Sequence, residues 1–411
     1  MSGRCSFGKQ FLQRTLLLAL MLPTLFLAGC LKSQTLDESE YVLAIAFDPG
    51  ETFTYRFSFA VQRINTEASE PRADGFFILS AEAETLFAAI ETVSASLSHE
   101  LSFARTTMMI FDASLLERDG CLADLLDSAM EQLLIRYNAN VYVSVDGALE
   151  ALEGLSGEDA QPGIDKLQSH FLDYASETGF LPRTNLMQLY ETMSGRCVDA
   201  ALPLIGTTEG LVRLGVADSV GGEAYAYLAG RMLTQTGLQT GVAGAALLRD
   251  DRMVGVLDGQ NVQLLLLVAG GFENGGMQFS LPESTGGELY AAVRQDGAAR
   301  VELILGETPR ATVALKLYLH AMHPETLPDG VTIEALERRI ESELAGRLQS
   351  LFDTCRSLGS DVFGFGRYAV RQFQSVADWE AYDWADVYYN MEATFTVDVV
   401  LDANEYHALL K

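Results

Sequence analysis

Hydrophobic and polar positions form short blocks along the chain, and these blocks predict a mixture of strands and helices. Residues 41–47 (YVLAIAF) are an apolar run that ends at the turn sequence Asp48-Pro49-Gly50, which predicts a buried strand. Large side chains at every second position from 53 to 61 predict a half-buried strand. The two strands are expected to pair as a hairpin.

The period then lengthens. Leu86, Ile90, Val93 and Leu97 recur at spacings of four, three and four, which places them on one face of a helix. Residues 155–182 are polar, with two prolines and several glycines, and are predicted to be a long surface excursion. The same reasoning gives strands at 107–111 and 141–145 and a second helix at 122–134.

The rest of the chain is also predicted to contain both strands and helices. Residues 206–244 are rich in glycine and weakly patterned, whereas 243–248 and 253–257 flank the polar turn 249–252 and predict a second hairpin. A long helix is predicted at 333–355, with Thr332 as its N-cap and Glu334 in its first turn. Further apolar, sheet-like segments lie at 262–269, 288–293, 299–305, 312–320 and 393–401. The predicted class is α+β in several layers.

The N-terminus has the three parts of an export signal. Three basic residues and no acidic residue precede a 13-residue apolar run at 15–27, which is too short for the roughly 20 residues that span a bilayer. The ending Leu27-Ala28-Gly29-Cys30 resembles the bacterial lipobox, in which the cysteine receives a diacylglyceryl group before cleavage. We therefore predict a lipoprotein signal peptide at 1–29 and lipidation of Cys30. The alternative is an ordinary secretory signal with a chance cysteine.

Charge narrows the range of partners. Residues 30–411 carry 25 basic and 56 acidic residues, a net charge of −31, because all three basic residues of the signal are removed with it. Such a surface repels nucleic acid and anionic head groups. The lipid would then hold the protein at the membrane, since two acyl chains suffice for stable anchoring.

The sequence contains no set of motifs that is typical of an enzyme. No P-loop, dinucleotide fingerprint, nucleophile elbow or HExxH motif occurs, so no catalytic, metal-binding or cofactor-binding residue is predicted. His320 and His323 are predicted to lie where a strand passes into a loop, so they are not expected to face the same way as metal ligands would. Asp146 and Glu150 are explained by helix capping. Cys121, Cys197 and Cys355 are isolated, allow one disulfide and are read as small buried hydrophobes.

An aromatic cluster near the C-terminus can be read in two ways. It could be a platform on which a ligand stacks, or it could pack in the core or against another subunit, and we favour packing. Its members are Trp379, Tyr382, Trp384, Tyr388 and Tyr389.

The order of features along nearly the whole chain resembles the Ger(x)C family, the lipoprotein C subunits of spore germinant receptors. Ile45-Ala46-Phe47-Asp48 looks like the family's early "giaiD" segment, and residues 141–148 resemble its "v-v-v-a-k-G-x-A" pattern. Residues 244–257 match its "G-t-A-v-f-k-x-d-k-l-v-G-x-L" hairpin closely. Residues 80–90 and 97–103 are similar to its early helix start and "lsrklyf" stretch, and 360–366 with Trp379 and Trp384 to its "s-D-i-f-g-f-g…W…W" signature.

The chain departs from the family pattern at three places. Leu31 and Lys32 follow the lipidated cysteine where Trp-Asp is usual, and Ala83 stands where the helix start has glycine. Arg105 lies near the position of a family histidine. These departures suggest a divergent member.

The resemblance implies a fold, a role and partners. The expected fold is three mixed α/β domains with largely antiparallel sheets flanked by helices: an N-terminal α+β domain at 30–205, a glycine-rich β domain at 206–282 and a C-terminal α+β domain at 283–411. The implied role is non-catalytic: a subunit lipid-anchored on the outer face of the spore inner membrane that assembles with the receptor's A-type and B-type membrane subunits and helps to transduce nutrient signals. A substrate-binding lipoprotein of a transporter is the main alternative, and a lipid-anchored envelope hydrolase is a third reading.

Overall fold

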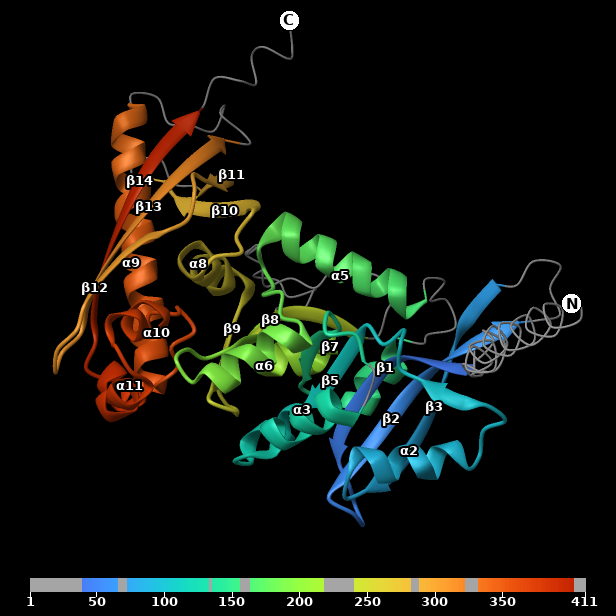
Figure 1. Ribbon diagram of the computed structural model, residues 1–411. Helices are drawn as coiled ribbons and strands as arrows, with labels where there is room; N and C mark the ends of the chain where they lie inside the picture. Colours follow the sequence, from blue (N-terminus) through green and yellow to red (C-terminus); the bar gives the residue numbers. More distant parts are fainter. Residues whose placement is uncertain are drawn as a thin grey trace, which may run out of the picture. The chain divides into compact units, whose positions relative to one another are not determined.

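The computed structural model describes residues 39–65, 72–132, 135–155, 163–217, 240–281, 288–321 and 332–402 (Figure 1). The predicted signal peptide at 1–29 and Cys30 lie outside these ranges, as does His323. Across the described ranges, no helix combines the length and apolar character needed to cross a membrane.

The first half of the described chain is built on a nine-stranded mixed sheet with the path β3-β2-β1-β5-β6-β7-β8-β9, and β4 pairs with β1 beside this path. Its central pairs β1–β5, β5–β6 and β6–β7 are parallel, and the pairs towards both edges are antiparallel. The strands are β1 (Ser39–Pro49), β2 (Tyr55–Asn65), β3 (Arg72–Ala83), β4 (Glu100–Ser102), β5 (Met108–Asp112), β6 (Asn140–Ser144), β7 (Ala201–Thr207), β8 (Thr240–Arg249) and β9 (Arg252–Leu257).

Both faces of this sheet are covered, because successive side chains of a strand point to opposite faces. Ile45 and Phe47 of β1 pack with α2, α3 and α6 on one face, whereas Ala44 and Ala46 pack with α4 and α5 on the other. Burial on both faces explains the unbroken apolar run of β1. The helices are α2 (Leu86–Ser94), η2 (Ala113–Glu117), α3 (Cys121–Gln132), α4 (Ala148–Gly154), α5 (Ile164–Thr178), α6 (Leu186–Gly195) and α7 (Thr208–Arg213).

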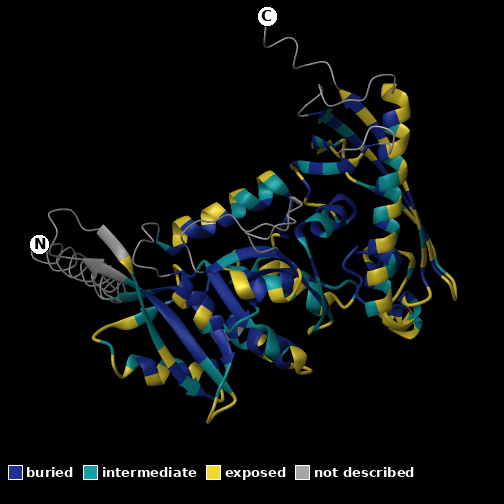
Figure 2. Ribbon diagram, turned by 180° about the vertical axis from the view of Figure 1, so that it is seen from behind, coloured by how far each residue is buried: buried dark blue, intermediate teal, exposed yellow. Residues whose placement is uncertain are grey.

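The second half carries a five-stranded sheet in which β13 pairs antiparallel with β11 and β12 and parallel with β14. The strands are β10 (Asn274–Ser280), β11 (Glu288–Gln295), β12 (Arg300–Ile304), β13 (Arg310–Ala321) and β14 (Glu392–Asp402). One face packs on α8 and the long helix α9, and side chains exposed to solvent alternate with buried ones along β13 and β14 (Figure 2). The helices are α8 (Gly259–Ala269), α9 (Ile333–Leu358), α10 (Gly366–Ala369), η4 (Val370–Gln372), α11 (Val376–Tyr382) and α12 (Trp384–Tyr388).

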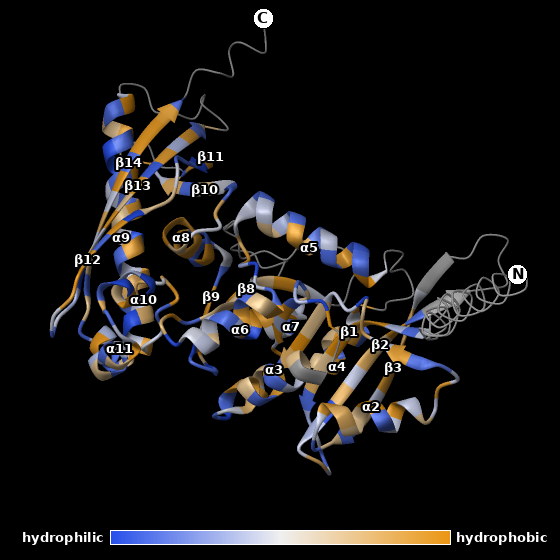
Figure 3. Ribbon diagram, in the orientation of Figure 1, coloured by the Kyte–Doolittle hydropathy of each residue, from blue (hydrophilic) through white to orange (hydrophobic). Residues whose placement is uncertain are grey.

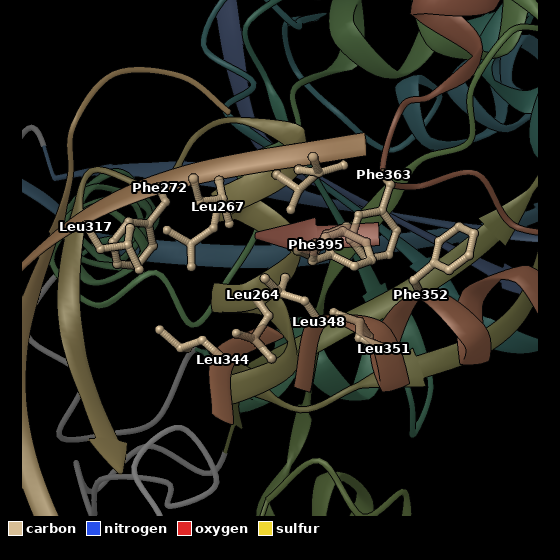
Figure 4. Close-up of a cluster of buried hydrophobic side chains, with 14 of the residues drawn as sticks. Leu264, Leu267, Phe272, Leu317, Leu344, Leu348, Leu351, Phe352, Phe363 and Phe395 are labelled. Atoms are coloured by element: carbon tan, nitrogen blue, oxygen red, sulfur yellow. The ribbon is translucent and has the colours of Figure 1, made fainter. Parts of the chain in front are cut away.

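The core of this half is centred on Phe352 of α9, which is fully buried. Its ring lies 6.0 Å from the ring of Phe363 and 6.0 Å from that of Phe395, centroid to centroid. Figure 4 shows these three rings beside Leu348 of α9 and Leu264 of α8. Helix and sheet therefore share one apolar interior, as the predicted stripe on the long helix requires.

The predicted fold class is confirmed, as are the hairpins, the long helix and its cap. Thr332 accepts the backbone N–H of Ala335 at 3.3 Å, and α9 extends from Ile333 to Leu358. Antiparallel strand pairs predominate, as predicted. Several elements have no counterpart in the prediction, among them β3, β7, β10, α6 and α7.

Two segments were predicted wrongly. The polar stretch at 155–182 contains α5, in which Ile164, Leu167 and Phe171 are buried at helical spacing while the polar majority faces solvent. The segment 262–269 is α8 rather than a strand, and it is apolar almost all round (Figure 3). A helix buried on most sides shows no period, so periodicity could not separate it from a strand.

The predicted middle region is divided between the two sheets. Strands β8 and β9 of the segment 206–282 extend the nine-stranded sheet beside β7, whereas β10 of the same segment pairs with β11 of the five-stranded sheet. The three-domain division with boundaries at 205 and 282 stays a prediction.

Candidate functional site

A group of hydrogen bonds joins the nine-stranded sheet to the loop that follows α9. The two carboxylate oxygens of Asp199, between α6 and β7, accept the backbone N–H groups of Asp250 and Asp361, each at 2.7 Å. The hydroxyl of Ser360 donates to the carbonyl of Leu248 in β8. We call these five residues the seam. They bring together three segments that are far apart in the sequence.

Asp361 organises its own loop. One carboxylate oxygen accepts the N–H groups of Gly364 and Phe365 at 3.1 and 2.9 Å, and the other accepts the N–H of Gly366 at 2.7 Å and Trp384 Nε1–H at 3.0 Å. The residue is 2% exposed. Four donors on one buried carboxylate fix the loop and the indole together.

Glycine is required twice in this loop. Gly364 has φ +79°, a conformation that side chains with a Cβ rarely adopt. A Cβ on Gly366 would lie 1.6 Å from the carbonyl oxygen of Cys197 and 2.8 Å from the indole nitrogen of Trp384. The glycines that look like a phosphate loop in the sequence therefore serve close packing.

The carboxyl groups of Asp361 and Asp199 both have raised pKa values. Burial raises the pKa of Asp361 to about 7, against the pull of its N–H donors, and the charge of Asp199 raises it further. Burial likewise raises the pKa of Asp199 to about 6. Every oxygen of the two carboxylates already accepts at least one N–H, so the arrangement fixes backbone rather than presenting an acid or base to a substrate.

A second buried carboxylate joins two other distant segments. Asp48, at the end of β1, accepts the backbone N–H groups of Ala148 and Leu149 at 2.6 and 2.9 Å and so caps α4. Gly147, with φ +107°, precedes the helix and supplies no side chain of its own. Burial raises the pKa of Asp48 to about 6. The cap thus comes from a strand about a hundred residues earlier.

The capping role predicted for Asp146 is therefore wrong. Its carboxylate accepts the N–H and hydroxyl of Thr207 at 2.8 and 2.7 Å and pairs with Arg213 at 2.8 Å, so it holds the start of α7 instead. The neighbouring Asp48 already occupies the first N–H groups of α4. Glu150 lies in the first turn of α4, where a negative charge suits the helix dipole.

Most of the aromatic cluster packs in the core. Trp379, Trp384 and Tyr388 are buried, and the two indole rings lie 6.1 Å apart, centroid to centroid. Tyr382 contacts the carbonyl and N–H of Gly306 through its hydroxyl. Tyr389 is 40% exposed and accepts a hydrogen bond from Arg249 at 2.7 Å. The favoured packing interpretation is confirmed.

The cysteines and histidines that the structure describes form no joint site. Cys121 and Cys355 are buried, Cys197 is half-buried, and all three are free thiols. His320 lies on β13. Across the described ranges, no three His, Cys, Asp or Glu side chains gather as metal ligands would.

A cleft of about 690 Å³ opens beside the seam. Its walls come from the loop before α6 and the first turns of that helix, from Cys197–Ala201, from the end of α8, and from Val362 and Arg367. No residue of this cleft was singled out as a binding residue from the sequence. Asp199, which belongs to both cleft and seam, is one of 56 acidic residues and carries no distinguishing pattern.

Two family models match the chain. "Spore germination protein N-terminal domain" matches residues 32–207, and "Spore germination B3/ GerAC like, C-terminal" matches residues 243–404. The chain belongs to the Ger(x)C family. It is 21% identical over 392 residues to the spore germination protein GerQC of Bacillus cereus, covering 92% of this chain and 95% of that one.

The fold is similar to that of a solved structure. The crystal structure of the GerBC protein superposes with a TM-score of 0.52 at 10% identity, over 87% of this chain and 96% of that chain. At this identity the likeness concerns the fold alone.

Four of the segments that carry the Ger(x)C resemblance contact each other in two pairs. Asp48 of the early motif binds Ala148 of the "G-x-A" motif. Leu248 and Asp250 of the hairpin motif meet Ser360 and Asp361 of the last motif through the seam. The motifs therefore describe joints of the fold.

Proposed function

We propose that the chain is the lipid-anchored, non-catalytic C subunit of a spore germinant receptor. The observation that carries the proposal is the match of two spore-germination models to residues 32–207 and 243–404, together with a GerQC relative of nearly the same extent. Cys30 would receive the lipid and hold the chain on the outer face of the spore inner membrane.

The arrangement of polar groups supports a non-catalytic role. The buried carboxylates of Asp48 and Asp361 and the half-buried carboxylate of Asp199 accept backbone N–H groups that join distant segments. An enzyme would instead aim an acid, base or nucleophile into a cleft. Such joints suit a rigid subunit that holds its place between partners.

The proposed partners are the receptor's A-type and B-type membrane subunits. The mature chain's charge of −31 makes attraction to anionic lipid an inadequate anchor, so lipid and protein contacts would together fix its position. In this complex the chain would help to pass a nutrient signal to the membrane subunits.

Affinity purification from spore membranes tests the assembly. A C-terminally tagged full-length chain should recover one A-type and one B-type subunit after mild detergent extraction. Cys30→Ala is the matched variant, expected to fold normally but to leave the membrane fraction and lose both partners. Recovery of an intact, membrane-bound chain with neither subunit would contradict the proposal.

A further inference from the structure

The cleft beside the seam has the size of a small-molecule site. Its volume is about 690 Å³, within the roughly 300–1,000 Å³ typical of ligand pockets. It lies where the two family regions meet: Arg183 and Gln188 come from the N-terminal region, and Leu265, Val362 and Arg367 from the C-terminal region. A ligand here would contact both.

The cleft presents one available cation. Arg367 is exposed, and among the described residues it forms no ion pair, although the chain has two acidic residues for every basic one. Its positive charge lowers the pKa of the Cys197 thiol, against the larger effect of burial, so its guanidinium acts on the cleft wall that contains Cys197. The other arginine of the cleft, Arg183, is already paired with Glu273.

Asp199 and Asp361, whose charges also act on the Cys197 thiol, form no ion pair with Arg367 and accept backbone N–H groups instead. Asp199 is occupied by the N–H groups of Asp250 and Asp361, and Asp361 by four further donors. The Arg367 donors thus stay available to a group that enters the cleft. A carboxylate matches them well, because it can accept two parallel N–H bonds from one guanidinium.

The other side chains that line the cleft favour some anions over others. Glu191 and Asp199 also line the cleft, so a multiply charged anion such as phosphate would be repelled by them. Glu191 can accept hydrogen bonds from hydroxyl or amino groups. Leu265, Leu266 and Val362 offer an apolar surface for a carbon skeleton.

We propose that this cleft binds a small, singly charged carboxylate that also carries hydrogen-bond donors, and that Arg367 recognises the carboxylate group. The ligand would bridge the two family regions next to the seam. Binding would therefore restrain both walls of the cleft.

Titration of the full chain in detergent with D-gluconate tests the proposal, with D-glucitol as the uncharged counterpart. We expect saturable gluconate binding below about 10 mM and none by glucitol. We also expect slower hydrogen exchange at 181–188 and 362–367. Phosphate at matched ionic strength should bind at least about tenfold more weakly.

Variants assign the effect to one side chain. Arg367→Gln should weaken gluconate binding about tenfold or more, as loss of a charge-assisted pair does, and Arg367→Lys should restore part of it. Arg371→Gln is the matched control: it removes the same charge from an arginine that lies over the ring of Tyr368 and does not line the cleft. It should bind as the wild type does.

Three results would overturn the proposal. They are absence of saturable gluconate binding, an unchanged affinity in Arg367→Gln, and phosphate binding as tight as gluconate. Because Arg367 is exposed, its variants should keep the wild-type urea midpoint, so a loss of binding will not reflect unfolding.

Discussion

Replacement of Asp361 by asparagine should destabilise the protein most at acidic pH. The amide keeps one oxygen for Gly364 and Phe365, but its nitrogen would face the N–H groups of Gly366 and Trp384. Two buried donors lose their acceptor, at about 1–3 kcal/mol each, or about 2–6 kcal/mol together.

Ionisation of Asp361 itself destabilises the wild type, and the size of this effect depends on pH. The folded-state pKa of Asp361 is raised to about 7 from 3.8, so its contribution to stability is fully present below pH 3.8 and is lost as the pH rises through 7. Between pH 5 and 7 the wild type should lose about 2 kcal/mol of unfolding free energy from this group. The uncharged asparagine has no such loss. The difference in unfolding free energy between the wild type and Asp361→Asn should therefore shrink by that amount from pH 5 to pH 7.

Urea unfolding at pH 5, 6, 7 and 8 measures the difference, followed by tryptophan fluorescence. The chain has only two tryptophans, and Trp384 donates directly to Asp361, so the signal reports on this region. Asp353→Asn removes a partly exposed carboxylate of α9 and is the control, whose difference from the wild type should not narrow by this amount. A gap between Asp361→Asn and the wild type that stays constant or widens towards pH 8 would refute the reasoning.

Three further changes probe packing and anchoring. Phe352→Ala empties the centre of the C-terminal core and should cost about 3–5 kcal/mol in urea unfolding; a cost under 1 kcal/mol would contradict the packing described. Gly366→Ala should destabilise the protein by about 1–3 kcal/mol, because its Cβ would clash with the carbonyl of Cys197. Gly346→Ala, in open space on α9, should stabilise it by about 1 kcal/mol. Equal urea midpoints for the two variants would contradict this. Mass spectrometry of the mature chain should find a diacylglyceryl group on an N-terminal Cys30, and an unmodified cysteine there would disprove lipidation.

The sequence predicts elements well where burial is one-sided or complete within a short run. The stripe on the long helix reflects a single buried face and is present in the structure. The alternation along 53–61 predicts the strand β2 but not its burial, because residues 57–61 are buried on both faces of the sheet and Phe53 is exposed before the strand begins. Prediction fails at α8, whose buried residues surround the helix, and at α5, where the polar majority hides a narrow apolar stripe. In both cases the secondary structure depends on tertiary packing, which the local sequence pattern does not reveal.

The joints of the fold are harder to predict than its elements. Asp48 and Ala148 are each visible in a family-like motif, but their contact depends on β1 ending beside the start of α4. Asp199 has no motif at all, and its role arises only because three loops converge on it. A single sequence holds no signal for contacts of this kind.

Nutrient-triggered germination of spores that lack the gene tests the central claim most directly. The account predicts that the response to at least one nutrient mixture is lost and is restored by the wild-type chain, while a chemical trigger that bypasses nutrient receptors still works. Deletion spores that germinate normally with every nutrient in the panel would contradict a role as a germinant receptor subunit.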